Sequence, residues 1–138
     1  MQLHRGRLID HVHLVVKDLE ASRRFYTALM SALGVPSGLS GPDFFQYDEL
    51  YVSTVSHTGV GRLTGRVHLA FATRERAMVD AAYRAAIEAG ATDNGKPGER
   101  PYHPGYYAGF VLDPDGNNIE VVFHGPAEYS ASSIVITF

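Results

Sequence analysis

A strand followed by a helix occurs twice in this chain, and that repeat constrains the fold more than any other feature. Residues 8–16 (LIDHVHLVV) and 65–73 (GRVHLAFAT) are rich in β-branched residues and leucine, which predicts two strands. Residues 18–34 carry apolar side chains at helical spacing, residues 74–90 are rich in alanine, and each segment ends in glycine, which predicts two helices. The pattern therefore predicts two related halves that share one core.

Two offsets relate the halves. The identical triplet VHL at residues 12–14 and 67–69 suggests an offset of 55, whereas an offset of 57 also aligns the starts of both helices. Because the offsets differ by two residues, both keep the same strand faces inward. We prefer the offset of 57, although any two amphipathic strand–helix units share some similarity. This offset pairs His11 with His68, Lys17 with Arg74, Asp18 with Glu75, and Tyr26 with Tyr83.

The segments that follow each predicted helix contain the remaining strands. Residues 43–56 read as one or two short strands with a turn near Asp48 and Glu49. Residues 91–105 are rich in Gly, Pro and Asn, which predicts a loop. The turn residues PDGNN separate two apolar runs and predict a hairpin. Further strands are predicted at residues 106–113, at 119–125 and, at an edge or a subunit contact, at 132–138.

The composition excludes several classes of protein. Of the 138 residues 45% are hydrophobic and 20% are charged, which is ordinary for a globular protein and not for a disordered one. The formal net charge is −3 without a cluster of lysine or arginine, so we expect no nucleic-acid partner. The chain has no run of about eighteen apolar residues and no leader segment, so we expect no membrane partner and a cytoplasmic location. Because cysteine is absent, any metal must have nitrogen and oxygen ligands.

Two histidines and one glutamate are candidates for a metal site. His11 and His68 lie on corresponding strands of the two halves, so they would converge if the halves pack about a pseudo-twofold axis. Glu120 is the only acidic residue in NNIEVVFHG, and a carboxylate inside a sheet is costly unless it is paired or bound to a cation. Two imidazoles and one carboxylate leave open positions on a divalent metal. The alternatives are a hydrogen-bonded core histidine at His11 and an ion pair with arginine at Glu120.

Three stretches resemble one known family, the vicinal oxygen chelate superfamily, which includes glyoxalase I, the bleomycin-resistance proteins and the extradiol dioxygenases. These stretches are DHVHLVVKDLEASRRFY, GRVHLAFA and FVLDPDGNNIEVV, and the resemblance spans residues 8–124. It implies an α+β fold in which paired βαβββ modules form an open, cupped mixed sheet, usually in a homodimer. The implied single domain, 1–138, comprises modules at 8–63 and 64–124 and a C-terminal extension at 125–138.

The resemblance also implies a cofactor and a reaction. By position, the metal ligands are His11, His68 and Glu120, and the ion is one of Fe(II), Mn(II), Ni(II) or Zn(II). The substrate is a small molecule that binds the ion through two adjacent oxygens. His13, on the same strand face as His11, is expected deeper in the cup, where it contacts the substrate. The alternative function is a non-catalytic protein that sequesters a ligand, as bleomycin-resistance proteins do.

The fourth ligand of glyoxalase I has no clear counterpart here. That ligand is usually a glutamate from a late strand of the first module. This region offers only Asp48 and Glu49 in a predicted turn, Tyr51 and Ser53 in the strand that follows, and His57 in a loop. A three-ligand site, as in the dioxygenases, is therefore favoured over a lyase site. The motif HLAF, which begins at His68, also resembles the dioxygenase branch.

Aromatic residues near the expected site are candidates for substrate contact. The stretch GERPYHPGYYAGF places Tyr102, His103 and Tyr106 among glycines and prolines, immediately before a core strand. We expect His103 to act in catalysis, because an imidazole titrates near neutral pH, and Tyr106 to transfer a proton or orient the substrate. Phe45, Tyr51 and Tyr102 are expected to contact the substrate. The alternative is a tyrosine-rich rim that packs against the other subunit.

Overall fold

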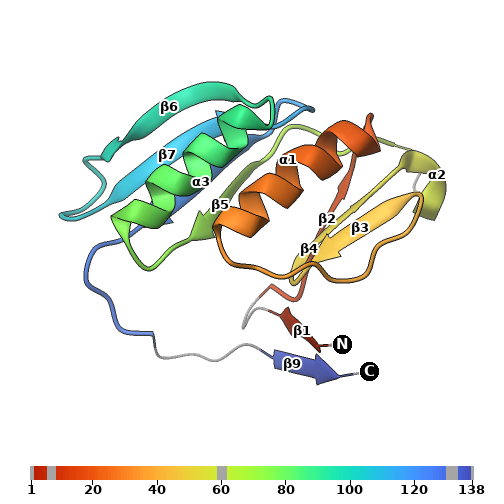
Figure 1. The fold of residues 1–138 in the computed structure, drawn as a ribbon, viewed down its shortest axis with the longest axis horizontal. Coiled ribbons are helices and arrows are strands. Elements are labelled where there is room, and N and C mark those ends of the chain that lie inside the picture. The colour runs from red at the N-terminus through yellow and green to blue at the C-terminus, as the bar shows by residue number, and fades with distance from the viewer. Residues whose placement is uncertain (1, 6–8, 59–61, 130–133, 138) are drawn as a thin grey trace.

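The computed structural model describes residues 2–5, 9–58, 62–129 and 134–137 (Figure 1). The predicted α+β fold is confirmed, and the structure adds β1, α2 and β6 to the helices and strands that the sequence indicated. The elements are β1 (Gln2–Arg5), β2 (Val12–Val15), α1 (Leu19–Ala32), β3 (Phe44–Tyr47), β4 (Leu50–Ser53), α2 (Val55–Thr58), β5 (His68–Ala72), α3 (Arg76–Glu88), β6 (Thr92–Glu99), β7 (Tyr107–Leu112), β8 (Asn118–Phe123) and β9 (Ile134–Thr137).

The first half contains a three-stranded sheet in the order β2–β4–β3. Strands β2 and β4 are parallel, and β3 pairs with β4 through the predicted turn, where Asp48 has a positive φ of 42°. The implied βαβββ module has one more strand than residues 9–58 show, and only an isolated bridge between Ser40 and Phe45 occupies its place. We refer to β2–α2 as the first half.

The second half contains a four-stranded sheet in the order β5–β8–β7–β6. Strands β7 and β8 form the predicted hairpin, and β5 is parallel to β8. The prediction of a loop at residues 91–105 was wrong, because residues 92–99 form β6 at the edge of this sheet. An edge strand tolerates proline and bulges, and the β6–β7 register shifts on both sides of Gly95. We refer to β5–β8 as the second half.

Both predicted helices are confirmed, and they lie side by side on the same side of the two sheets (Figure 1). α1 follows Asp18, whose Oδ1 accepts a hydrogen bond of 3.1 Å from the Ala21 amide, and it ends before Gly34, which has a φ of 73°. α3 follows Glu75, whose side chain makes no capping hydrogen bond. The helices begin at positions related by the offset of 57.

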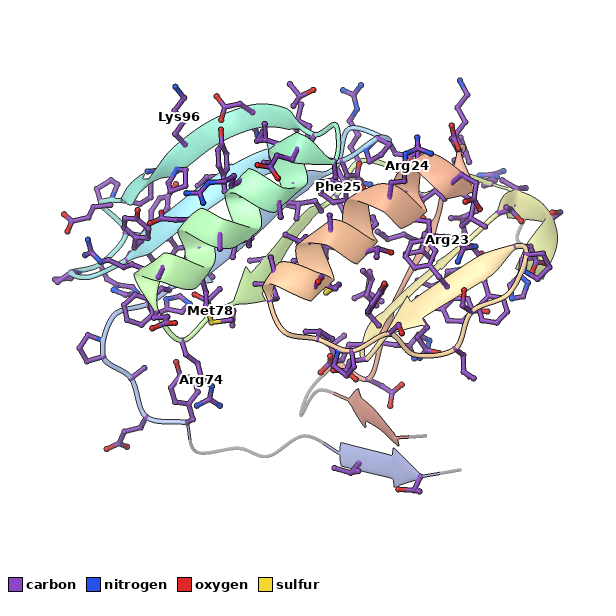
Figure 2. All side chains as sticks on the ribbon, in the orientation of Figure 1. Arg23, Arg24, Phe25, Arg74, Met78 and Lys96 are labelled. Carbon is purple, nitrogen blue, oxygen red and sulfur yellow. The ribbon has the colours of Figure 1, made fainter. Side chains whose placement is uncertain are left out.

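One continuous core lies between the helices and the sheets. Alternate residues of β2, β3, β4, β5, β7 and β8 face it, and among them Val52 and Ile119 are completely buried. Phe25 on α1, labelled in Figure 2, is also completely buried and packs edge-to-face on Tyr26 at 4.7 Å. Each sheet therefore has a second face, turned away from α1 and α3, on which polar side chains can lie.

The two ends of the described chain lie together. β1 pairs antiparallel with β9 and forms a separate two-stranded ribbon (Figure 1). β9 lies within the predicted strand 132–138, of which residues 132, 133 and 138 lie outside the described residues. The Arg74 guanidinium, labelled in Figure 2, packs over the Tyr129 ring at 4.1 Å and holds the segment after β8 against the start of the second half. Across residues 2–5, 9–58, 62–129 and 134–137, no helix is long and apolar enough to cross a membrane.

Candidate metal site

The second sheet brings His68 and Glu120 together. Glu120 lies in β8 opposite Ala70 of β5. Its neighbours Ile119 and Val121 face the core, so the Glu120 side chain lies on the other face of the sheet. His68 begins β5, and its Nε2 lies 2.8 Å from Glu120 Oε2. Because a carboxylate only accepts hydrogen bonds, His68 donates through Nε2. Tyr106 donates from its hydroxyl to the other carboxylate oxygen, Oε1. Two of the three predicted metal ligands therefore meet.

Burial makes these contacts energetically important. The Glu120 side chain is 4% exposed, whereas the His68 side chain is 52% exposed. A buried carboxylate without partners is unfavourable by several kcal/mol, so the two donors keep Glu120 stable in this position. Burial, followed by the hydrogen bond and the charge of Glu120, raises the pKa of Tyr106 to about 12. Tyr106 is therefore protonated at neutral pH and can donate to Glu120.

The third predicted ligand, His11, lies immediately before β2 in the first half. Its side chain is 53% exposed, and its Nδ1 lies 2.7 Å from Asp10 Oδ1. The structure does not bring His11 to the His68–Glu120 pair. Among the described residues of one chain, no group of three His, Asp or Glu side chains lies close enough to hold a metal ion. One chain thus supplies one imidazole and one carboxylate in contact.

Aromatic side chains gather around Tyr106, the hydrogen-bond partner of Glu120. His103 and His124 stack at 5.3 Å, with His103 Nε2 3.0 Å from His124 Nδ1, and both rings lie edge-on to Tyr106. Tyr102 is 67% exposed and contacts Tyr106 edge-on at 5.0 Å. His124 was not predicted, although it lies four residues after Glu120, at a spacing that puts both on one strand face.

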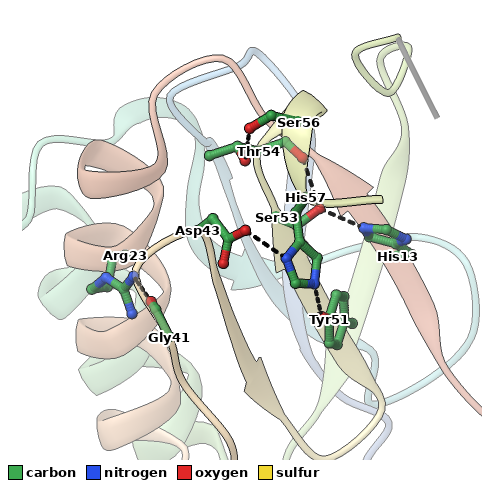
Figure 3. Close-up of polar contacts among 9 residues, drawn as sticks. All are labelled: His13, Arg23, Gly41, Asp43, Tyr51, Ser53, Thr54, Ser56 and His57. Atoms are coloured by element: carbon green, nitrogen blue, oxygen red, sulfur yellow. Dashed lines mark hydrogen bonds and ion pairs between the residues drawn. The ribbon is translucent and has the colours of Figure 1, made fainter. Parts of the chain in front are cut away.

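The first sheet places two of the predicted substrate contacts on its face away from α1. His13 donates from Nε2 to Ser53 Oγ at 2.8 Å, because the Ser53 hydroxyl itself donates to the Thr54 carbonyl. Burial, with smaller effects of His57 and His11, lowers the pKa of His13. Tyr51 contacts the His13 ring edge-on at 4.9 Å and is hydrogen-bonded to His57 (Figure 3).

Phe45 and the apolar pocket of the structure do not lie on the sheet faces that carry His13 and Glu120. Phe45 is 2% exposed and belongs to the core beneath α1, so it cannot contact a substrate on the opposite face, where its neighbour Phe44 lies. An apolar pocket of about 400 Å³ lies between the halves, but none of His11, His68 and Glu120 lines it. Its walls include Val12, Met30, Val35, Leu50, Leu69 and Phe71.

Fold and site together define a protein of two strand–helix halves with a histidine–glutamate pair on an uncovered sheet face. Residues 8–121 match the family described as the Glyoxalase/Bleomycin resistance protein/Dioxygenase superfamily, and the chain belongs to this superfamily. No curated protein matches the chain.

Solved structures show the same architecture. A glyoxalase/bleomycin resistance protein from Albidiferax ferrireducens T118 is 29% identical, with 83% of this chain and 97% of that chain covered and a TM-score of 0.68. A glyoxalase-related enzyme from Fulvimarina pelagi is 26% identical, with 91% and 94% covered and a TM-score of 0.67. The lactoylglutathione lyase of Agrobacterium tumefaciens, 21% identical with 81% and 90% covered and a TM-score of 0.58, is similar in fold alone.

Proposed function

We propose that the protein is a metal-dependent enzyme that binds a small substrate through two adjacent oxygens. One divalent ion is held by His68 and Glu120 of one chain and by His11 of a second copy. The observation that carries this proposal is the contact between His68 and the buried Glu120, which come from neighbouring strands and present nitrogen and oxygen donors together. A divalent ion bound to two imidazoles and a carboxylate polarises ligand oxygens and stabilises negative charge that develops on them.

The surroundings of His11 support its role as the third ligand. Its Nδ1 donates to Asp10, which leaves the Nε2 lone pair for another partner. Histidines that bind metals usually donate their second ring N–H to a carboxylate or a carbonyl in this way. Since His11 and His68 are both about half exposed, a second copy can reach them. The β1–β9 ribbon also favours a homodimer, because an isolated pair of strands is marginally stable by itself.

The first half favours a three-ligand site. Leu50 pairs with Val12 just as Ile119 pairs with Leu69, so Tyr51 occupies the place in the first half that Glu120 occupies in the second. A fourth carboxylate ligand of the glyoxalase I type would be expected near this place, and a phenol stands there instead. The proposal therefore favours a dioxygenase-like reaction over a lyase. Oxygen uptake with catechols, against turnover of a glutathione hemithioacetal, separates the two reactions.

The neighbouring side chains orient the site. Tyr106 donates a hydrogen bond to one carboxylate oxygen of Glu120 and so helps to orient the carboxylate. His103 is our proposed proton-transfer residue of this face, because its ring lies against Tyr106 and is exposed. His13, held by Ser53, and the exposed Tyr102 are proposed substrate contacts on the two sheets.

Metal content tests the ligand set directly. The purified wild-type protein should contain about one divalent ion per chain by elemental analysis, and His11→Ala, His68→Ala and Glu120→Gln should each lose it. Glu128→Gln is the matched control, because it removes the same charge from an exposed position and should keep the ion. Retention of the ion by Glu120→Gln would contradict the proposal.

Mixed dimers test whether the site is shared between chains. When His11→Ala and Glu120→Gln chains are co-expressed, each mixed dimer contains one site with both defects and one intact site. Metal content should therefore return to about one ion per mixed dimer, although neither variant binds metal alone. If the site lay within one chain, the mixed dimer would stay metal-free, which would contradict the second-copy arrangement but not the ligand set.

The second candidate function is a non-catalytic protein that sequesters a ligand. The absence of a complete metal-ligand group within the described residues of one chain favours it, as do the aromatic rings around Tyr106. Wild-type protein that lacks metal but binds an aromatic ligand tightly would support this function against the enzyme.

A further inference from the structure

Asp43, His57 and Tyr51 form a continuous line of hydrogen bonds in the first half (Figure 3). His57 Nδ1 lies 2.8 Å from Asp43 Oδ2, and His57 Nε2 lies 2.6 Å from the Tyr51 hydroxyl oxygen. The Asp43 carboxylate only accepts, so Nδ1 of His57 carries the hydrogen and donates it. Neutral His57 then accepts the Tyr51 proton at Nε2. Protons can therefore pass along this line toward His57.

Three separate elements hold the line in place. Asp43 precedes β3, Tyr51 lies in β4, and His57 lies in the single turn of α2. Phe44 stacks on the Tyr51 ring at 5.4 Å and on the His57 ring at 4.8 Å, with interplanar angles of 12° and 27°. These rings and His13, which lies edge-on to Tyr51, form an aromatic cluster on the face of the first sheet that is turned away from α1.

We propose that the Asp43–His57–Tyr51 line is a proton relay that ionises an acidic hydroxyl, of a phenol or an enol, on a small planar ligand. The O–H bond of the ligand breaks and its proton binds to the Tyr51 oxygen, while the proton of Tyr51 moves to His57 Nε2. The ligand becomes an oxyanion that accepts a hydrogen bond from Tyr51. His57 becomes an imidazolium beside the Asp43 carboxylate, and the total charge is unchanged.

The chemistry of the line selects this class of ligand. Because Tyr51 donates its own hydrogen to His57, only the lone pairs of its oxygen remain for a ligand. The Tyr51 oxygen therefore accepts a hydrogen bond from a ligand hydroxyl. A hydroxyl, an imidazole and a carboxylate in this order also relay a proton in serine hydrolases. Burial and, secondarily, the charge of Asp43 raise the pKa of Tyr51, so a phenolate does not accumulate. The aromatic rings beside Tyr51 favour a planar ligand that can pack against them. Efficient proton transfer to an imidazole requires a hydroxyl that is more acidic than an alcohol.

The probe that tests the relay is 4-nitrophenol, whose ionisation changes its absorption spectrum. It has a single hydroxyl, so it lacks the two adjacent oxygens of the proposed metal ligand. With the full chain, the acid dissociation constant of the bound probe should rise by about tenfold over that of the free probe. Nitrogen-15 NMR should show that His57 becomes an imidazolium when the probe binds, at a pH at which it is neutral in the free protein. Treatment with a chelator should change neither result, because the relay contains none of the proposed metal ligands.

Matched variants assign the effect to Tyr51. Tyr51→Phe should lose the tenfold increase. Tyr47→Phe is the matched control and should keep the increase. Tyr47 belongs to the same β3–β4 hairpin as Tyr51, but its ring faces the core and its hydroxyl donates to Thr27 of α1. Failure of wild-type protein to bind the probe, or binding that leaves His57 neutral, would overturn the proposal whatever the variants do. Loss of the increase on chelation would assign the ionisation to a metal and would also overturn it.

Discussion

Tyr26 and Tyr83 occupy the same place on α1 and α3, but they meet carboxylates in very different surroundings. The Tyr26 hydroxyl donates to Asp113 at 2.5 Å, and both residues are buried. The Tyr83 hydroxyl donates to Asp93 at 2.7 Å on the protein surface. The first contact joins α1 of the first half to the β7–β8 hairpin of the second, whereas the second contact stays within one half. Equivalent residues therefore have different roles when one lies at the junction of the halves.

The functional residues differ between the halves in the same way. In the second half Glu120 contacts His68 and Tyr106, and His68 and Glu120 form one part of the proposed metal site. In the first half the position of Glu120 is taken by Tyr51, which belongs to the relay with His57. The two similar halves thus present different polar side chains on their uncovered sheet faces. A substitution in one half can therefore be compared with the substitution at the equivalent position of the other half.

The largest difference is expected for the two tyrosines. Tyr26→Phe should lower the free energy of unfolding by about 2 kcal/mol, because it removes a hydrogen bond to a buried charged group. Tyr83→Phe should change it by less than about 0.5 kcal/mol, because its carboxylate partner is exposed to water. Urea unfolding of both variants measures the difference, and equal losses would contradict the distinction between the two contacts.

Tyr26 should also affect the stability of the protein at alkaline pH. Burial, followed by the charge of Asp113, raises the pKa of Tyr26 well above its ordinary value of 10. Tyr26 in the unfolded chain loses its proton from about pH 10, while in the folded protein it keeps it. The contribution of Tyr26 to the free energy of unfolding is therefore fully present below about pH 10. It is lost, by about 1.4 kcal/mol per pH unit, as the pH rises toward and through the pKa of Tyr26 in the folded protein.

Unfolding of wild type and Tyr26→Phe between pH 8 and pH 12 measures this contribution. The variant should lose stability less steeply above about pH 10, because phenylalanine cannot ionise, so the two curves should converge. Parallel curves would show that Tyr26 does not keep its proton in the folded protein.

The smallest difference is expected at the two helix starts. Asp18→Ala should lower the free energy of unfolding by about 1 kcal/mol, because it removes the hydrogen bond that caps α1. Glu75→Ala, at the equivalent start of α3, should have little effect, because the Glu75 side chain makes no such bond. Denaturant midpoints of the two variants give the comparison, and a similar loss in both would mean that capping does not distinguish the helices.

Several elements could be predicted because their signals are local. The caps and glycines at the ends of α1 and α3 lie within a few residues of the helices that they limit. The turn between β7 and β8 is specified by its own residues. Strand β6 was missed because its glycines and proline resemble a loop, and only pairing with β7 makes it a strand. Pairing depends on a partner that is distant in the sequence.

The candidate sites also differ in whether local sequence signals could predict them. The contact between His68 and Glu120 could be predicted because each lies in a regular strand on a known face. The line through Asp43, His57 and Tyr51 carries no motif, since its members lie before a strand, in a single helical turn and within a strand. The burial of Phe45 was also decided by packing, because either face of its strand could have met α1.

The amino-acid sequence by itself determined the two strand–helix repeats, the superfamily and the strand faces on which His68 and Glu120 lie. It did so because side-chain periodicity and turn residues act over short stretches of chain. The tertiary structure decided which side chains touch, since residues far apart in the sequence meet only when the halves pack. Packing joined Tyr26 to Asp113 and Tyr51 to His57, and it left His11 away from the pair that it was expected to complete.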